Sequence, residues 1–235
     1  MTGPRPFYYV YDLQSGTSHR SPRGLWGTTF TDKRSNDANA SLQTCSFSAT
    51  GEMLAVAGRR GYIHLVDWKA TASGSQVIAS VKMNSNVRSL WWNNKGELLS
   101  LGDDSEVYVW DIAERRCVRR WKDDGGYGSK MITGDQSNKY LVTGSGKIAA
   151  LRCTRLIVSG SSRSGYVNIY GASETFGTGT DKPRPLKTLG NLNTAISSLT
   201  LNHDSQLLVM ASDDRKDQLR LVRCNCRSYS GSASW

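Results

Sequence analysis

The sequence predicts an all-β chain that folds as an incomplete β-propeller, with about four blades of a larger ring. Three observations support this prediction. A two-strand pattern occupies residues 96–111, the same pattern recurs along the chain, and its copies are evenly spaced. Because each copy is one supersecondary unit that cannot bury its apolar face alone, such an array indicates stacked blades.

The pattern is clearest between Gly96 and Asp111. A leucine-rich run, 98–101, precedes the turn 102–105, which contains one glycine, two aspartates and a serine. Glycine tolerates positive φ and aspartate hydrogen-bonds its own backbone, so this is a tight turn. The run 107–111 then alternates with a period of two, as a strand does, and ends in the dipeptide Trp110-Asp111.

The copies recur at the spacing of WD40 blades. The glycines that open the turns, Gly58, Gly102 and Gly144, are 44 and 42 residues apart, and WD40 repeats have a period of roughly 40–45 residues. We therefore expect a WD40-type β-propeller. The blades should occupy 41–222, with 1–40 as the remnant outer strand of a preceding blade plus a loop, and 223–235 as a disordered tail.

The third blade breaks the pattern. Gly144 and Tyr166 are 22 positions apart, whereas the corresponding intervals are four positions in blade one and five in blade two. The excess, about 146–163, interrupts a hairpin inside a sheet. Two interpretations remain open: non-native sequence, such as an intron that was translated, or a genuine surface insertion.

Composition limits the class of protein. The formal net charge is +10 and the isoelectric point is about 9.5, which favours a polyanionic partner over the alternative of an inert basic surface. Five cysteines with no paired spacing argue against a secreted disulfide framework, so we expect an intracellular, reduced chain. We expect no membrane segment and no signal peptide.

No constellation of residues predicts catalysis. The three histidines, His19, His64 and His203, occupy unrelated positions and are expected to be structural. The segment 143–147 partly matches a phosphate-binding loop, but Leu141 and Ile148 replace the required glycine and hydroxyl residue. Cys224 and Cys226 form only a weak candidate metal pair. We therefore expect no enzymatic activity, no cofactor, no metal and no small-molecule substrate.

Basic residues are the candidate contacts for RNA or an acidic partner, because guanidinium and ammonium groups on loops suit phosphate or carboxylate groups. An ordinary solvated surface is the alternative. The candidates are Arg59, Arg60, Arg115, Arg116, Arg119, Arg120, Lys182, Arg184 and Lys187.

Several stretches resemble a known family. The runs 52–66, 86–92, 96–121 and 189–199 are similar to the U3 small nucleolar RNA-associated protein 18 family of WD-repeat proteins. The resemblance implies a non-enzymatic scaffold in the nucleolar small-subunit processome, which supports pre-ribosomal RNA processing and small ribosomal subunit biogenesis. It also implies other processome proteins and the U3 particle as partners, and a location in the nucleus and nucleolus.

The sequence also departs from this family. The interruption at 146–163, the tail after Val222 and the lack of the family's N-terminal extension lead us to expect a truncated or mis-spliced fungal form. A generic WD40 adaptor for protein–protein interaction, unrelated to RNA, is the alternative function.

Overall fold

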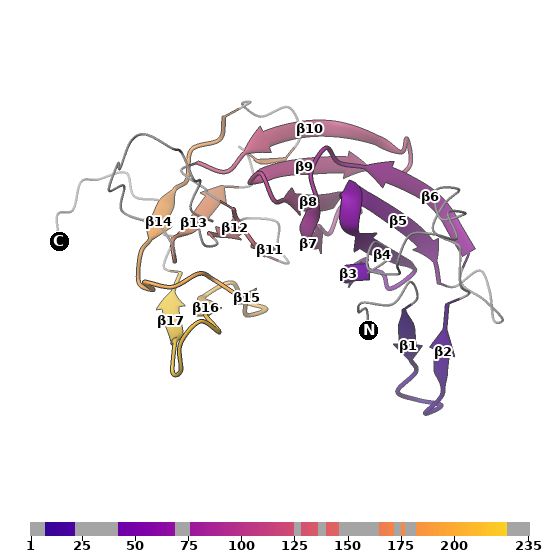
Figure 1. Cartoon of the computed structure of the whole chain (residues 1–235), viewed down its shortest axis with the longest axis horizontal. Helices are drawn as coiled ribbons and strands as arrows, with labels where there is room; N and C mark the ends of the chain where they lie inside the picture. Colours follow the sequence, from indigo (N-terminus) through magenta and orange to yellow (C-terminus); the bar gives the residue numbers. More distant parts are fainter. Residues whose placement is uncertain are drawn as a thin grey trace, which may run out of the picture.

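The chain folds into five antiparallel sheets arranged along an arc (Figure 1). The computed structural model describes residues 8–21, 42–68, 76–124, 128–135, 140–145, 165–171, 175–176 and 182–224. Apart from short helical turns, the ordered elements in these ranges are strands, so the prediction of an all-β chain is confirmed. The expected insertion at 146–163 lies outside the described residues.

Three sheets have four strands each, in a simple meander. The first contains β3 (Leu42–Phe47), β4 (Met53–Gly58), β5 (Tyr62–Asp67) and β6 (Gln76–Lys82). The second contains β7 (Val87–Trp92), β8 (Leu98–Gly102), β9 (Glu106–Asp111) and β10 (Arg116–Lys122). The third contains β11 (Met131–Gly134), β12 (Tyr140–Gly144), β13 (Val167–Gly171) and β14 (Lys187–Leu189). We call these sheets blades 1, 2 and 3.

The two remaining sheets are smaller and lie at the two ends of the arc (Figure 1). Blade 4 has three strands, β15 (Ser198–Leu201), β16 (Leu207–Ala211) and β17 (Leu219–Arg223). The N-terminal hairpin consists of β1 (Tyr9–Tyr11) and β2 (Ser18–Arg20). We expected one remnant strand followed by a loop in 1–40. The structure instead has a second strand, because Ser18–Arg20 pair with β1 in antiparallel register.

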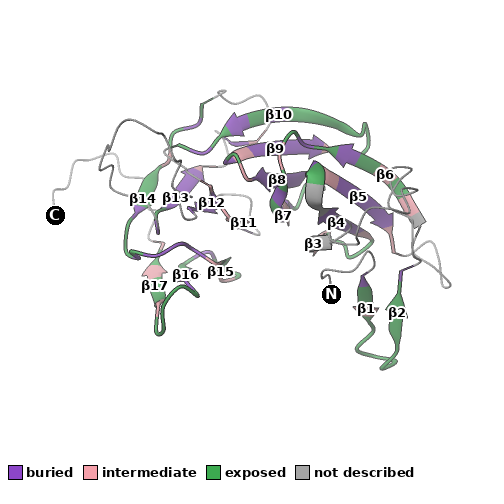
Figure 2. Ribbon diagram, in the orientation of Figure 1, coloured by how far each residue is buried: buried purple, intermediate pink, exposed green. Residues whose placement is uncertain are grey.

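The blades stack through their faces and their first strands. β7 contacts β3 of the preceding blade and β11 of the following one, and β11 in turn contacts β15. We call the side of a blade that packs toward the next blade in the chain its forward face, and the opposite side its rear face. In Figure 2 the middle strands β5, β8 and β9 are mostly buried, whereas β2 and β10 are mostly exposed.

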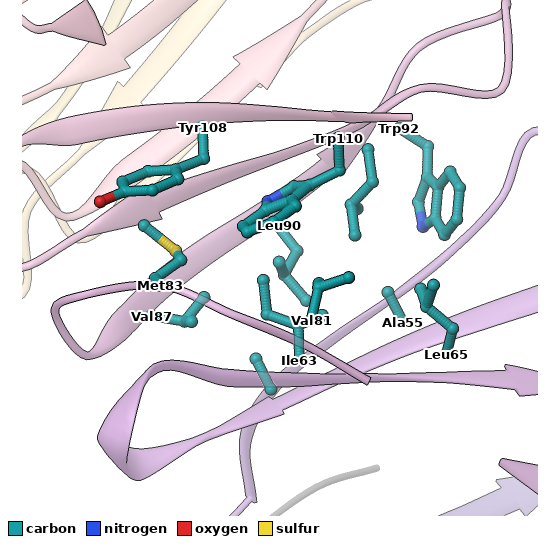
Figure 3. Packing of buried hydrophobic residues seen from close by; sticks show 12 residues of the cluster. Ala55, Ile63, Leu65, Val81, Met83, Val87, Leu90, Trp92, Tyr108 and Trp110 are labelled. Atoms are coloured by element: carbon teal, nitrogen blue, oxygen red, sulfur yellow. The ribbon is translucent and has the colours of Figure 1, made fainter. Parts of the chain in front are cut away.

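Blade 2 shows how one strand supplies both faces. Tyr108 and Trp110 of β9 form part of the rear face and belong to the same buried hydrophobic cluster as Ile63 and Leu65 of blade 1 (Figure 3). Val107 and Val109 point the other way and join a cluster with blade 3. The period of two in residues 107–111 therefore encodes two buried faces.

Trp110 is the anchor of the rear face. Its side chain is 4 % exposed, its ring stacks on Tyr108 with centroids 5.6 Å apart, and its Nε1–H donates to Ser100 Oγ at 2.7 Å. The indole is thus buried with its one polar group hydrogen-bonded, as is usual for a buried tryptophan.

The ends of β12 and β13 meet directly, although 145–166 separates them in the sequence. Gly144 pairs with Val167 in the ladder, and the Ser145 amide donates to the Tyr166 carbonyl at 2.8 Å. At Gly165 the backbone has φ of 86°, and an added Cβ would collide with the Leu192 carbonyl. The two strands therefore form a continuous hairpin ladder up to the point where the long segment begins.

The prediction that 223–235 is a disordered tail is wrong for its first two residues. Arg223 pairs with Leu207 in the last strand, and the Cys224 amide donates to the Gln206 carbonyl at 2.7 Å. Residues 225–235 lie outside the described part of the chain.

We predict that Trp110→Ala lowers the free energy of unfolding by about 3–5 kcal/mol, because it empties a packed site and leaves the Ser100 hydroxyl without its donor. Chemical denaturation monitored by circular dichroism measures this difference. Val118→Ala, at an exposed position of β10, is the matched control and should change stability by less than about 0.5 kcal/mol. Equal effects of the two substitutions would show that Trp110 is not an anchor.

Deleting 146–163 should stabilise the chain. The deletion shortens the connection between Gly144 and Val167 to Ser145, Ser164, Gly165 and Tyr166, while the strand ladder on both sides stays paired. The entropic cost of closing a four-residue loop is about 1.5 kcal/mol lower than that of closing a 22-residue loop. The melting temperature should therefore rise by a few degrees. A lower melting temperature in differential scanning calorimetry would show that the segment contributes to the folded state.

Candidate functional site

Arg59 and Arg60 lie in the turn between the second and third strands of blade 1, as the sequence predicts. The short helical turn η3 (Arg59–Gly61) holds Arg60 at φ of 66°, a left-handed conformation that is uncommon for residues other than glycine. The Arg60 amide donates to Asn86 Oδ1 at 2.8 Å, which fixes the turn to the loop that leads into blade 2. The Arg60 side chain is exposed, and the Arg59 side chain lies outside the described part.

Asn86 continues this connection on blade 2. Its Nδ2–H donates to Asp103 Oδ2 at 3.1 Å, and Asp103 also forms an ion pair with Arg88. The Ser85 hydroxyl donates to the neighbouring Asp104 at 2.9 Å. The turn that contains Arg59 and Arg60 is therefore held by a polar network that joins blades 1 and 2 on this side of the arc.

Arg115 lies at the opposite end of the sheet, in the turn between the third and fourth strands of blade 2, and Arg116 is the first residue of the fourth strand. The Asp111 carboxylate shapes this turn by accepting the amides of Ala113 at 2.9 Å and Glu114 at 3.2 Å. Arg115 is exposed, and Arg116 Nε lies 2.6 Å from Glu114 Oε2. Because this ion pair is exposed, it contributes little to stability.

The expectation that Arg119 makes a surface contact is wrong. Its side chain is buried, with 7 % exposed. The reason is visible in β10, where Arg119 lies two residues before buried Trp121 and so shares its face. A register shift between Cys117 and Arg119 turns the chain at this point. Arg119 is thus removed from the candidate contact surface.

Arg120 is exposed but already has partners within its own blade. Its Nε lies 3.0 Å from Glu106 Oε2, and its guanidinium lies over the Tyr108 ring, 5.6 Å from the centroid. The nearby Tyr108 and Glu106 raise the pKa of Arg120. A phosphate contact at Arg120 would compete with these interactions.

Lys182 and Arg184 are exposed in the connection from the third to the fourth strand of blade 3, and Lys187, also exposed, is the first residue of the fourth strand. The Leu186 amide donates to the Ile169 carbonyl at 2.7 Å, which continues the ladder between β13 and β14. Phe176, earlier in this connection, lies against Trp91 of blade 2, with ring centroids 6.1 Å apart.

The topology divides the candidates into two groups. In an antiparallel meander, successive connections lie at opposite ends of the sheet. The connection from the third to the fourth strand therefore lies on one common side of the four-stranded blades, and we call the exposed cations in this connection of blades 2 and 3, or at the start of the strand that follows it, the basic group. Its members are Arg115, Arg116, Lys182, Arg184 and Lys187. Arg60 lies on the other side of the arc.

A buried carboxylate that was not predicted to be functional organises the joint between blades 2 and 3. Asp123 accepts hydrogen bonds from the Ser129 hydroxyl at 2.7 Å, the Thr143 hydroxyl at 2.9 Å, the Asn168 amide at 2.9 Å and the Tyr170 hydroxyl at 2.6 Å. Burial and the neighbouring Asp123 raise the pKa of Tyr170, which keeps its hydroxyl protonated as a donor. Four donors on one carboxylate offset its desolvation.

His64 forms a hydrogen bond within blade 1, away from the other two histidines. It is buried in β5, and its Nδ1 lies 2.8 Å from Ser80 Oγ. Burial lowers the pKa of His64 to about 4, so the ring is neutral at physiological pH. His19 and His203 are exposed.

Two kinds of feature are absent from the described ranges. No group of three or more potential metal-ligating side chains comes together within the described ranges. Among those same ranges, no helix has the length and apolar character needed to cross a membrane. What remains is an arc of stacked sheets with polar loops on both sides.

Comparison with known proteins agrees with this architecture. Residues 75–111 match the family described as WD domain, G-beta repeat. A chain in the crystal structure of the mitotic checkpoint complex superposes with a TM-score of 0.64 over 89 % of this chain and 52 % of its own, at 15 % sequence identity. The WD40-type propeller fold is therefore confirmed.

Sequence relatives decide the family. The probable U3 small nucleolar RNA-associated protein 18 of Schizosaccharomyces pombe is 30 % identical over 99 % of this chain, and the Arabidopsis thaliana homologue is 31 % identical over 94 %. The chain belongs to this family. The human homologue is 30 % identical over 94 % of the chain. The chain spans only 39 %, 35 % and 34 % of the lengths of these three relatives.

The neutral state of His64 predicts an acid-dependent loss of stability. Between pH 6.5 and pH 4, His64 is protonated in the unfolded chain but still neutral in the folded chain, where its pKa is about 4. The free energy of unfolding therefore falls as the pH falls. The loss should reach about 3 kcal/mol near pH 4. Urea unfolding of wild type and His64→Phe across this range should show a flatter profile for the variant. His203→Ala is the control, and a wild-type slope in His64→Phe would contradict the assignment.

Proposed function

We propose that the chain is a non-enzymatic WD-repeat scaffold of the nucleolar small-subunit processome, where it supports pre-ribosomal RNA processing and small ribosomal subunit biogenesis. The observation that carries the proposal is the similarity, over nearly the whole chain, to relatives named for association with U3 small nucleolar RNA. The proposal places the protein in the nucleus and nucleolus. Its partners are other processome proteins and the U3 particle with its pre-ribosomal RNA.

The architecture supports a scaffold role. A stacked array of blades presents many loops on a rigid frame, and binding through loops needs no catalytic constellation. The Asp123 network and the Asn86 network both join neighbouring blades, so loops on different blades are held in register with one another. A large particle can use such a surface as a fixed platform.

The basic group is the proposed contact with phosphate or with an acidic partner. It places exposed cations of blades 2 and 3 on a common side of the arc. Arg115 in particular occupies a turn that the Asp111 carboxylate fixes in shape. Phosphate contacts of this kind provide affinity and position without sequence specificity. Tyr108 and Trp121 are buried and are not available to stack on bases.

A charge-removal experiment tests this surface. The triple variant Arg115→Ala, Lys182→Ala and Lys187→Ala should bind single-stranded RNA more weakly. Because each lost phosphate contact lowers the slope of log affinity against log salt by about 0.7, the slope should become shallower by up to about 2. Fluorescence anisotropy over a salt series measures both effects. The matched control is Arg60→Ala, Arg215→Ala and Lys216→Ala, which removes three exposed cations from the other side of the arc.

Association with particles tests the function itself. Tagged wild-type protein should sediment with large pre-ribosomal particles, and the first triple variant should be depleted from them. Recovery of wild type only in a smaller soluble complex without U3 RNA would contradict the proposal and favour the generic WD40 adaptor. Particle association that is unaffected by the triple variant would assign binding to a different surface.

A further inference from the structure

The outer strands of blades 1 and 2 each contain one extra residue at the same position. In blade 1, Ile78 is left out of the pairing between β5 and β6, because its two neighbours pair with consecutive residues of β5. In blade 2, Val118 is left out in the same way, because its two neighbours pair with consecutive residues of β9. Each outer strand therefore has a β-bulge with an aliphatic side chain on the extra residue.

Leu186 holds this position in blade 3. The bulged residues of blades 1 and 2 directly precede the partners of Leu65 and Val109. Leu186 directly precedes Lys187, which is the partner of Ile169, and the Leu186 amide donates to the Ile169 carbonyl at 2.7 Å. Leu65, Val109 and Ile169 are equivalent, since each belongs to the buried cluster that its blade shares with the following one. The same aliphatic position thus recurs on three consecutive blades.

All three side chains are exposed to solvent. Ile78, Val118 and Leu186 are 40 %, 46 % and 58 % exposed. A single exposed aliphatic residue is ordinary on a protein surface. Among the described residues of blades 1 to 3, however, Phe47 and Tyr166 are the only other large apolar side chains with 40 % or more exposed. Exposed apolar surface is therefore concentrated at one repeated position instead of being scattered.

The repeated position lies on the outside of the arc. The fourth strands β6, β10 and β14 are each at the edge of their sheet, and they follow the outer side of the arc, whereas the first strands lie on its inner side (Figure 1). A bulge interrupts the regular row of backbone groups on an edge strand and twists the edge, which opposes the addition of a strand from another chain. A partner at these edges therefore binds mainly through side chains.

The outer strands of blades 2 and 3 are also strongly basic. Residues 116–122 and 182–189 contain seven arginine and lysine residues and no aspartate or glutamate. Arg119 is buried, and Arg116 and Arg120 form ion pairs with glutamates that lie outside these segments. The four further exposed cations are Lys122, Lys182, Arg184 and Lys187. Val118 and Leu186 are therefore aliphatic positions in a surface that favours carboxylates.

Blade 1 has the aliphatic residue without this charge. Its outer strand, 76–82, contains Lys82 as its one charged residue, and the Lys82 ammonium lies over the Tyr62 ring, 5.0 Å from the centroid. The contrast separates the two components of the surface, because Ile78 shares the bulge position of Val118 but not its basic surroundings.

We propose that the outer edges of blades 2 and 3 bind an acidic segment of a partner protein, whose apolar side chains cover Val118 and Leu186. Carboxylates of the segment complement the exposed cations, and its apolar residues remove the aliphatic side chains from water. RNA fits this surface less well, because RNA is bound through phosphate contacts and through stacking on aromatic or guanidinium planes. The inference rests on the proposed function only in that it uses Lys182, Arg184 and Lys187 of the basic group.

The two components of the surface should respond differently to salt and to substitution. Attraction between exposed charges is screened by salt, whereas burial of aliphatic surface is not weakened by it. Binding should therefore weaken as salt is added but should retain a part that depends on the aliphatic residues. Loss of one aliphatic anchor should weaken binding by about tenfold.

Selection from a random peptide library displayed on phage, with the full 235-residue chain as target, tests the proposal without assuming a ligand sequence. Enriched peptides should combine several aspartate or glutamate residues with leucine, isoleucine or aromatic residues. A synthetic peptide of enriched sequence should bind Val118→Ser and Leu186→Ser about tenfold more weakly than wild type in fluorescence anisotropy. Ile78→Ser is the matched control and should bind as wild type does. Thermal melts by circular dichroism establish that each variant is folded.

Three results would overturn the proposal. The first is a selection in which no enriched peptide is acidic. The second is a set of acidic peptides that all bind Val118→Ser and Leu186→Ser as tightly as wild type. The third is an equal loss of binding in Ile78→Ser, which would show that the basic surroundings do not define the site.

Single-stranded RNA separates this proposal from the proposed function. Val118→Ser and Leu186→Ser should leave the affinity for RNA unchanged, because neither removes a charge. A loss of RNA affinity in these variants with peptide binding intact would assign the surface to RNA and overturn the proposal. Sedimentation with pre-ribosomal particles is a separate measurement. A chain that binds acidic peptides but does not sediment with particles would contradict the scaffold function and leave this inference standing.

Discussion

The whole structure depends on the stacking of sheet faces. Each blade is a twisted sheet with two apolar sides, and neither side can be buried within the blade itself. The third strand solves this problem by alternating, since Val107 and Val109 face one neighbour while Tyr108 and Trp110 face the other. Every other feature of the chain, including the placement of its charged loops, follows from the repetition of this contact along the arc.

Polar networks then set the angle and register that apolar contacts leave loosely defined. Leucine and valine side chains pack in many orientations, whereas a carboxylate with four directed donors does not. Asp123 draws its donors from three strands of blade 3 or their flanks, and the most distant donor, Tyr170, is 47 residues away. A directed hydrogen bond also connects the Arg60 turn to blade 2, because the Arg60 amide donates to Asn86. The proposed scaffold role relies on these joints, because a platform is useful only if its loops keep fixed relative positions.

Sequence patterns located the strands of the four blades but not the strand Ser18–Arg20, and they did not predict which arginines are exposed. The alternation and spacing around Gly58, Gly102 and Gly144 located the blades because the period of two is a local property of each strand. Arg119 was misplaced because a register shift in β10 changes the side to which a residue points, although buried Trp121 two residues later carried a signal. The Asp123 network escaped notice because its partners come together only after the sheets have stacked. The pairing of β1 with Ser18–Arg20 was missed because these residues lack an apolar alternation.

The hairpin ladder between β12 and β13 has a practical consequence for work with this protein. The Ser145 amide donates a hydrogen bond to the Tyr166 carbonyl where the long connection begins and ends, so the pairing of the two strands does not require a particular length of chain between them. A folded reporter, such as a fluorescent domain with flexible linkers, can therefore be placed within that connection instead of at a terminus.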